Sequence, residues 1–106
     1  MNSNSKGKRG ERKVRDYFRE GGFTARRGQQ FSGNPDSPDV VVDELKDFLH
    51  IEVKHGKTIK WQAMIDQARK DCGGKDWIGC VLQDRHEPLA VMPLKQAIEW
   101  SKIYLD

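Results

Sequence analysis

The sequence predicts a mixed α/β domain in which a central five-stranded sheet is flanked by helices. Helix-type and strand-type segments follow one another in the order α-β-β-β-α-β-β-α. Their apolar residues recur at helical spacing in some segments and alternate or run together in others. The length of 106 residues is typical of one domain, and no internal repeat divides it. A single domain over residues 1–106 is therefore expected.

The first helix is expected to begin at about Lys6 or Gly7, with Ser5 as a candidate N-cap, and to end at Glu20 before two glycines. Residues 1–5 are expected to be disordered. Three apolar side chains form the stripe that should face the core, namely Val14, Tyr17 and Phe18.

Five segments are expected to be strands: Phe23–Arg27, Asp39–Asp43, Phe48–His55, Trp77–Gln83 and Leu89–Met92. A loop rich in glycine, proline, asparagine and serine joins the first two over residues 28–38. A short turn at residues 44–47 joins the second and third strands. These two strands should therefore form a β-hairpin.

The second helix is expected over Trp61–Cys72, and two glycines after it provide a stop. One face of this helix carries its apolar residues, which are Trp61, Met64, Ile65, Ala68 and Cys72. Gln67 lies at the margin of that face, where it would be a surface residue or a polar group presented to a site. Pro93 suits the first turn of a last helix that runs to about Lys102.

Charge is distributed unevenly along the chain. Residues 1–30 hold nine basic and three acidic side chains, a net charge of +6, although the whole chain carries only +3. A basic front end on a small domain suggests a polyanionic partner, of which nucleic acid is the commonest, but a solvated helix face with a basic tail explains the charge equally well.

The sequence also argues against membrane and secretory classes. It has no apolar run of the roughly 18 residues needed to span a bilayer, and its N-terminus lacks the apolar core of an export signal. Cys72 and Cys80 are too few for a disulfide scaffold. A reduced, cytoplasmic setting with no membrane partner is therefore expected.

Carboxylates converge on one end of the predicted hairpin. Side chains alternate along the third strand, so Glu52 and Lys54 share one face, whereas Leu49, Ile51 and Val53 share the other, which reads as core. Asp39 opens the partner strand at the same open end of the hairpin. On the first helix, Glu11 heads the stripe that contains Val14 and Phe18 and should point toward the sheet.

Converging carboxylates beside a lysine suit Mg²⁺, which prefers oxygen ligands and polarises a phosphoryl oxygen. A nearby ammonium stabilises the extra charge of a phosphoryl transition state. The set therefore indicates metal-dependent phosphodiester hydrolysis. The structural alternatives are a solvent-facing Glu52–Lys54 pair and an Asp39 that only shapes a turn. His50 shares the Glu52 face, either as a partly buried sheet residue or within reach of the site.

The pair Pro38-Asp39, followed after twelve residues by Glu52-Val53-Lys54, resembles the signature of the PD-(D/E)xK nuclease superfamily. Within it the chain is most similar to archaeal-type Holliday-junction resolvases and their phage relatives. The similarity runs from about Lys6 to Gln83 through KGKRGERKVRDYF, GGFTARRG, IEVK, QARKDCGGKDW and IGCVLQ. It implies a restriction-endonuclease-like core and a homodimer that nicks two opposed strands of a four-way DNA junction during recombination and repair.

The resemblance also implies roles for individual residues. The metal ligands would be the carboxylates of Glu11, Asp39 and Glu52 and the carbonyl of Val53, holding Mg²⁺ with Mn²⁺ as a substitute. Lys54 would assist attack. A loop serine would complete the catalytic set, with Ser32 as the first candidate and Ser37 as a competitor. DNA contacts would come from the basic residues Lys8, Arg9, Arg12, Arg26 and Arg27.

Two further functions remain open from the sequence. One is another nuclease of the same superfamily that acts on branched or duplex DNA, and the other is a non-catalytic nucleic-acid-binding module with structural carboxylates. The apolar C-terminal segment offers a candidate dimer face, made of Ile98, Trp100, Tyr104 and Leu105.

Overall fold

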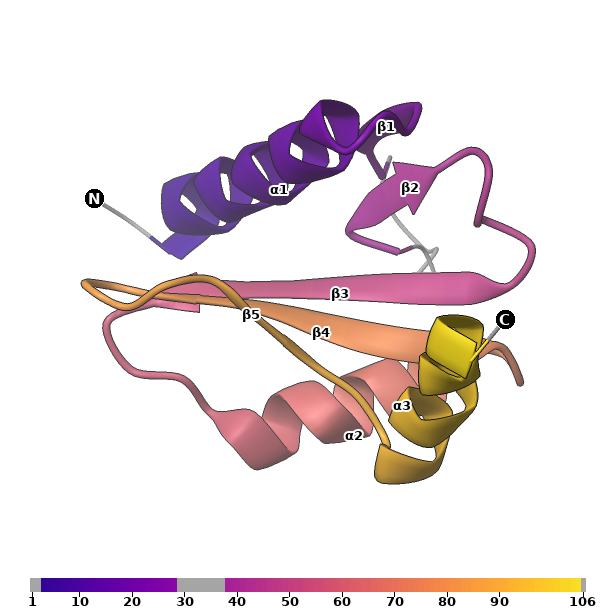
Figure 1. Ribbon diagram of the computed structural model, residues 1–106. Helices are drawn as coiled ribbons and strands as arrows, with labels where there is room; N and C mark the ends of the chain where they lie inside the picture. The colour runs from indigo at the N-terminus through magenta and orange to yellow at the C-terminus, as the bar shows by residue number, and fades with distance from the viewer. Residues whose placement is uncertain (1–2, 29–37, 106) are drawn as a thin grey trace.

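The fold is a mixed α/β arrangement in which helices cover both faces of a sheet, as predicted (Figure 1). The structure is a computed structural model, and it is described for residues 3–28 and 38–105. The elements in chain order are α1 (Ser3–Glu20), β1 (Ala25–Arg27), β2 (Val40–Val42), β3 (Leu49–Gly56), α2 (Trp61–Asp71), β4 (Asp76–Gln83), β5 (Leu89–Val91), α3 (Leu94–Ser101) and the 3₁₀ helix η1 (Lys102–Leu105).

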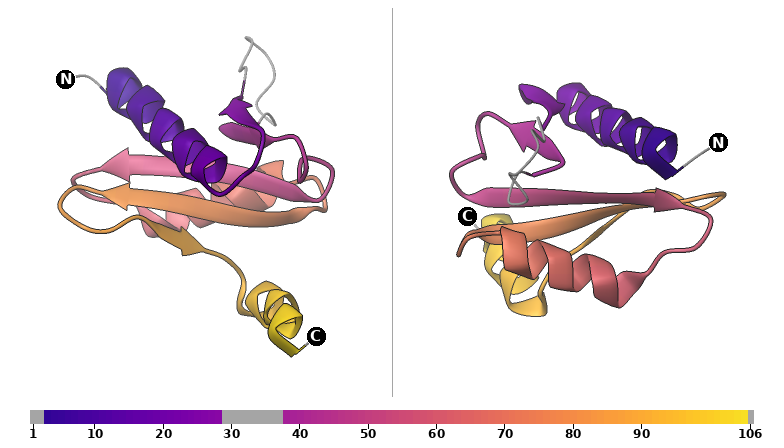
Figure 2. Two further views of the ribbon diagram at one scale, coloured as in Figure 1. Left: turned by 45° about the horizontal axis from the view of Figure 1, so that its top comes forward. Right: turned by 180° about the vertical axis from the view of Figure 1, so that it is seen from behind.

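The five strands form two sheets, so the prediction of one five-stranded sheet is wrong. β1 and β2 make an antiparallel pair, and β3, β4 and β5 make a mixed sheet with β4 in the centre. The β3–β4 pair is parallel and is connected through α2, as expected for a crossover unit. Figure 2 shows α1 and α2 on opposite sides of this sheet.

The predicted hairpin between β2 and β3 is wrong for a specific physical reason. The chain just before β2 approaches β3, where the Asp39 N–H donates to the Ile51 carbonyl at 3.0 Å. The Leu49 N–H, which would face β2 in such a hairpin, donates instead to the Leu45 carbonyl in the preceding turn at 2.9 Å. Because that donor is used within the turn, β2 forms no ladder with β3 and pairs with β1 instead. Further along β3, the Val53 N–H donates at 2.8 Å to the Asp39 side chain.

The main core lies between α1, the β1–β2 pair and one face of the larger sheet. Leu49, Ile51 and Val53 are buried in it, which confirms the predicted core face of the third strand. A smaller core on the other face joins Met64 of α2 to Val81 of β4. Gly79 makes this approach possible, since a Cβ there would lie 2.8 Å from the Met64 Sδ atom.

The first helix differs from its prediction in two ways. It begins at Ser3, so residues 3–5, expected to be disordered, are helical and Ser5 is not an N-cap. Tyr17 is 54% exposed rather than part of the core stripe, whereas Val14 is buried and Phe18 packs against the core. At the other end, the Arg19 Nε donates to the Ala25 carbonyl at 2.9 Å and ties α1 to β1.

Candidate active site

Asp39 is buried beside Ile51 and Val53 at the edge of β3 that is not paired with β4, and backbone hydrogen bonds fix its position. Its carboxylate accepts the hydrogen bond from Val53, and its own carbonyl accepts one from the Gly28 N–H at 2.9 Å. A Cβ on Gly28 would meet the Pro38 carbonyl oxygen at 1.9 Å, so this crossing requires glycine. The close approach of the chain at Gly28 therefore holds Asp39 against the edge of β3.

Asp39 stands in a strongly negative environment. Its burial, followed by the neighbouring charge of Glu52, raises its pKa from the usual 3.8 to about 7. The charge of Glu11 acts in the same direction, and the hydrogen bond from Val53 opposes the shift. The other two predicted carboxylates therefore both act electrostatically on Asp39, which burial and their charges leave partly protonated at neutral pH.

Glu11 and Glu52 approach Asp39 from different elements. Glu11, on α1, is half-buried and forms an ion pair with Arg27 of β1, whose Nε lies 3.1 Å from its Oε1. Glu52, on β3, is buried and its Oε1 lies 2.7 Å from the His50 Nε2. The sequence allowed two interpretations of His50, a partly buried sheet residue or a residue within reach of the site. In the structure it is a buried sheet residue that contacts Glu52.

The remaining predicted residues surround this centre. Val53 lies beside Asp39, and Lys54 follows on the Glu52 face of the strand with an exposed side chain. The three basic residues of α1 that were predicted to contact DNA are exposed, namely Lys8, Arg9 and Arg12. Arg26 makes an ion pair with Asp43. Ser32 and Ser37 lie outside the described residues.

The donor set fits a divalent cation. Two carboxylates, those of Asp39 and Glu52, repel each other in a buried setting, and a bound cation removes that repulsion. Among the described residues, the group of possible ligands whose atoms all lie within 4.8 Å of one another is a different one, His50, Glu52 and Asp71. Glu11 and Asp39 are not members of that group.

Sequence reasoning missed Asp71, although a signal for it exists. Met64, Ala68 and Asp71 follow one another at helical spacing along α2, and all three are buried. An acidic residue in the same stripe as two core residues indicates a polar contact beneath the sheet. Gln67, also left open, is exposed and donates a hydrogen bond to Asp71.

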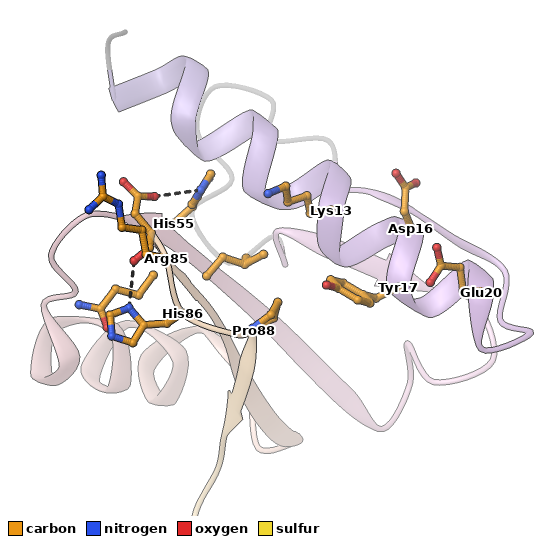
Figure 3. A pocket seen from close by; sticks show the side chains of 11 residues that line it. Lys13, Asp16, Tyr17, Glu20, His55, Arg85, His86 and Pro88 are labelled. Carbon is orange, nitrogen blue, oxygen red and sulfur yellow. Dashed lines mark hydrogen bonds and ion pairs between the residues drawn. The ribbon is translucent and has the colours of Figure 1, made fainter.

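A separate cavity of about 600 Å³ lies between α1 and the turn that connects β4 to β5 (Figure 3). Both acidic and basic side chains line this cavity. Among them, the His55 Nε2 lies 3.6 Å from the Asp84 Oδ1. Tyr17 lines this cavity, which explains its exposure. None of the carboxylates discussed above lines it, so it is distinct from the acidic centre.

The fold and the acidic centre define a nuclease-type α/β domain. A sequence model of the archaeal Holliday junction resolvase family, Hjc, matches residues 2–100. The chain therefore belongs to this family and is an endodeoxyribonuclease. The predicted family is thus confirmed.

One solved structure illustrates the shared fold. It is Hjc from Archaeoglobus fulgidus, a Holliday junction resolvase from an archaeal hyperthermophile, which is 24% identical to this chain. The match covers 82% of this chain and 72% of that one, with a TM-score of 0.57. No curated protein matches the sequence. In the described part of the chain, no helix is long and apolar enough to cross a membrane.

Proposed function

We propose that this nuclease resolves four-way DNA junctions by Mg²⁺-dependent hydrolysis and that it works as a homodimer. The observation that carries the proposal is the approach of the buried Asp39 and Glu52 carboxylates and the half-buried Glu11, whose like charges raise the pKa of Asp39, because such a set favours a divalent cation. Family membership supplies the junction as the substrate to test.

When bound, Mg²⁺ supplies Lewis-acid chemistry, which polarises a phosphoryl oxygen and lowers the pKa of water. Asp39 and Glu52 would hold it, with the Val53 carbonyl as a further oxygen ligand. Lys54 stands on the same strand face as Glu52 with its ammonium in solvent, where it can orient the attacking water and stabilise negative charge on the phosphate. Glu11 would be a further carboxylate ligand, and Arg27, which lies 3.1 Å from Glu11, would contact the scissile phosphate beside this centre.

Exposed basic residues at the N-terminal half of α1 provide the DNA contact. Lys8, Arg9 and Arg12 are exposed and positively charged, and the phosphate backbone is the complementary surface. Arg26 would exchange its ion pair with Asp43 for a phosphate. Because such contacts do not read bases, we expect binding that depends on salt and on DNA shape.

Junction resolution calls for a dimer, because one active site cuts one strand and a junction needs two cuts related by a twofold axis. An apolar groove of about 770 Å³ runs between the end of α1, the turn before β3 and the C-terminal helices. Its rim includes Phe48, which is 70% exposed, and Tyr104, which is 86% exposed. We propose this surface as the dimer face, and it includes Trp100 from the predicted C-terminal set.

The test is cleavage of a labelled four-way junction, compared with linear duplex of the same sequence, with and without Mg²⁺. Asp39→Asn and Glu52→Gln should abolish cleavage and keep junction binding, because the phosphate contacts come from basic residues. Asp47→Asn is the matched control, since Asp47 is exposed in the turn before β3 and should leave cleavage unchanged. Equal cutting of linear duplex would favour another nuclease activity. Binding without any cutting by the folded wild type would refute the proposal.

A further inference from the structure

A second group of ligand-type side chains lies beneath β3, on the side covered by α2. His50 and Glu52 project from β3, and Asp71 reaches them from the last turn of α2. All three are buried, and one ligand atom from each lies within 4.8 Å of the others. Two carboxylates and one imidazole therefore share a small buried space next to the proposed catalytic centre.

The hydrogen bonds within this group leave an acceptor without a donor. Asp71 is only 7% exposed, and its buried Oδ1 has no hydrogen-bond partner. Gln67 donates to its other oxygen, and the Nε2 of His50 is already engaged with Glu52. A buried carboxylate oxygen without a partner is unfavourable, so the site is short of positive charge.

Among the described residues, no lysine donates a hydrogen bond to the Asp71 Oδ1. Lys75, which lies nearby after α2, donates from its Nζ to the Lys46 carbonyl at 2.9 Å. A cavity of about 230 Å³ reaches both His50 and Asp71 and opens between β2 and the end of α2. A small cation therefore has both space and a polar destination there.

The donor types select the cation. Imidazole nitrogen suits Zn²⁺ and other transition metals, carboxylates also suit Mn²⁺, and Mg²⁺ takes oxygen ligands. Two ligand atoms that each lie about 2.1 Å from an ion are at most about 4.2 Å apart. The ligand atoms of this group lie within 4.8 Å of one another, so small side-chain rotations would let them bind one ion. The ion would take the place of the hydrogen bond between His50 and Glu52, which now measures 2.7 Å.

We propose that His50, Glu52 and Asp71 form a binding site for a transition-metal dication such as Mn²⁺ or Zn²⁺. Glu52 would then be a ligand of both this ion and the catalytic cation. The inference therefore rests on the proposed function through this shared residue. The ion fixes the Glu52 carboxylate and neutralises Asp71, whose Oδ1 otherwise has no partner.

The test detects a nitrogen ligand directly. Mn²⁺ is added alone to the purified protein, without DNA, and electron spin echo envelope modulation records coupling to ¹⁴N. The wild type should show a histidine coupling that disappears in His50→Gln. The coupling should persist in His86→Gln, the matched control at an exposed histidine. Asp71→Asn, which preserves side-chain shape, should weaken Mn²⁺ binding at this site by about tenfold or more.

A further variant separates this inference from the nuclease proposal. Asp39→Asn should keep the nitrogen coupling, because Asp39 is not a ligand of this site, even though it should lose cleavage. Circular dichroism confirms that each variant is folded, and Asp71→Asn serves as the deciding variant if His50→Gln does not fold. Absence of nitrogen coupling in the metal-saturated wild type, or its survival in folded His50→Gln, overturns the inference whatever the cleavage result.

Discussion

Replacing Asp39 by asparagine should make the metal-free protein more stable at pH 8 while it abolishes cleavage. The carboxylate is held among like charges in a buried place, and its pKa is raised to about 7. An asparagine still accepts the hydrogen bond from the Val53 N–H through its carbonyl oxygen. It also carries no charge to oppose Glu52. The substitution therefore removes a repulsion and keeps the structural contact.

The size and the pH window follow from the two pKa values. Below pH 3.8 Asp39 is protonated in both the folded and the unfolded chain, so its charge makes no difference to stability. As pH rises from 3.8 to about 7, the unfolded chain releases the proton and the folded chain keeps it, so the stabilisation that goes with the raised pKa is progressively lost. At about 1.4 kcal/mol per pKa unit, the loss is at most about 4 kcal/mol.

The assay is urea denaturation in EDTA at pH 4, 6 and 8 for the wild type and Asp39→Asn. The two proteins should have similar free energies of unfolding at pH 4. At pH 8 the variant should be more stable by roughly 1–4 kcal/mol. Adding Mg²⁺ at pH 8 should raise the stability of the wild type and leave that of the variant unchanged. A variant that is less stable at pH 8, or a difference that does not depend on pH, would refute the reasoning.

Three further predictions concern packing, charge and assembly. Gly79→Ala should cost about 1–3 kcal/mol in denaturation experiments, because the new Cβ would stand 2.9 Å from the buried Met64 Cε; an unchanged midpoint would contradict this. Arg27→Ala removes the cation 3.1 Å from Glu11, so the Mg²⁺ midpoint for cleavage should fall while junction binding in gel shifts weakens; a higher Mg²⁺ midpoint would count against it. Tyr104→Asp should shift sedimentation at micromolar concentration toward the monomer, and an unchanged dimer would remove this face as the interface.

Local pattern was enough to locate most elements and the main core. The spacing of Val14 and Phe18 identified the inner face of α1, and the alternation in β3 identified Leu49, Ile51 and Val53 as core. Tyr17 was misplaced because it sits at the margin of the same stripe, where only the shape of the neighbouring surface decides burial. Its partner there is a cavity rather than the core.

Strand pairing was predicted less well. Two strands that are close in sequence favour a hairpin, but the sequence does not show which acceptor each backbone N–H will use. Val40–Val42 had two possible partners, the strand before it and the strand after it. The short separation from Leu49 favoured the second, and the structure has the first. The difference lies in one backbone donor, since the Leu49 N–H that would face Val40–Val42 in a hairpin donates to the Leu45 carbonyl within the turn.

That same competition explains why the site lies where it does. If a ladder along β3 continued past Asp39, the Val53 N–H would be paired with backbone, and the Asp39 side chain would lose the hydrogen bond that now orients it. The unpaired edge of β3 instead lets the Asp39 side chain, just before β2, approach Glu52 while Glu11 approaches from α1. An interrupted sheet is thus a requirement for bringing these carboxylates together, because the Asp39 side chain occupies a position that a paired strand would fill.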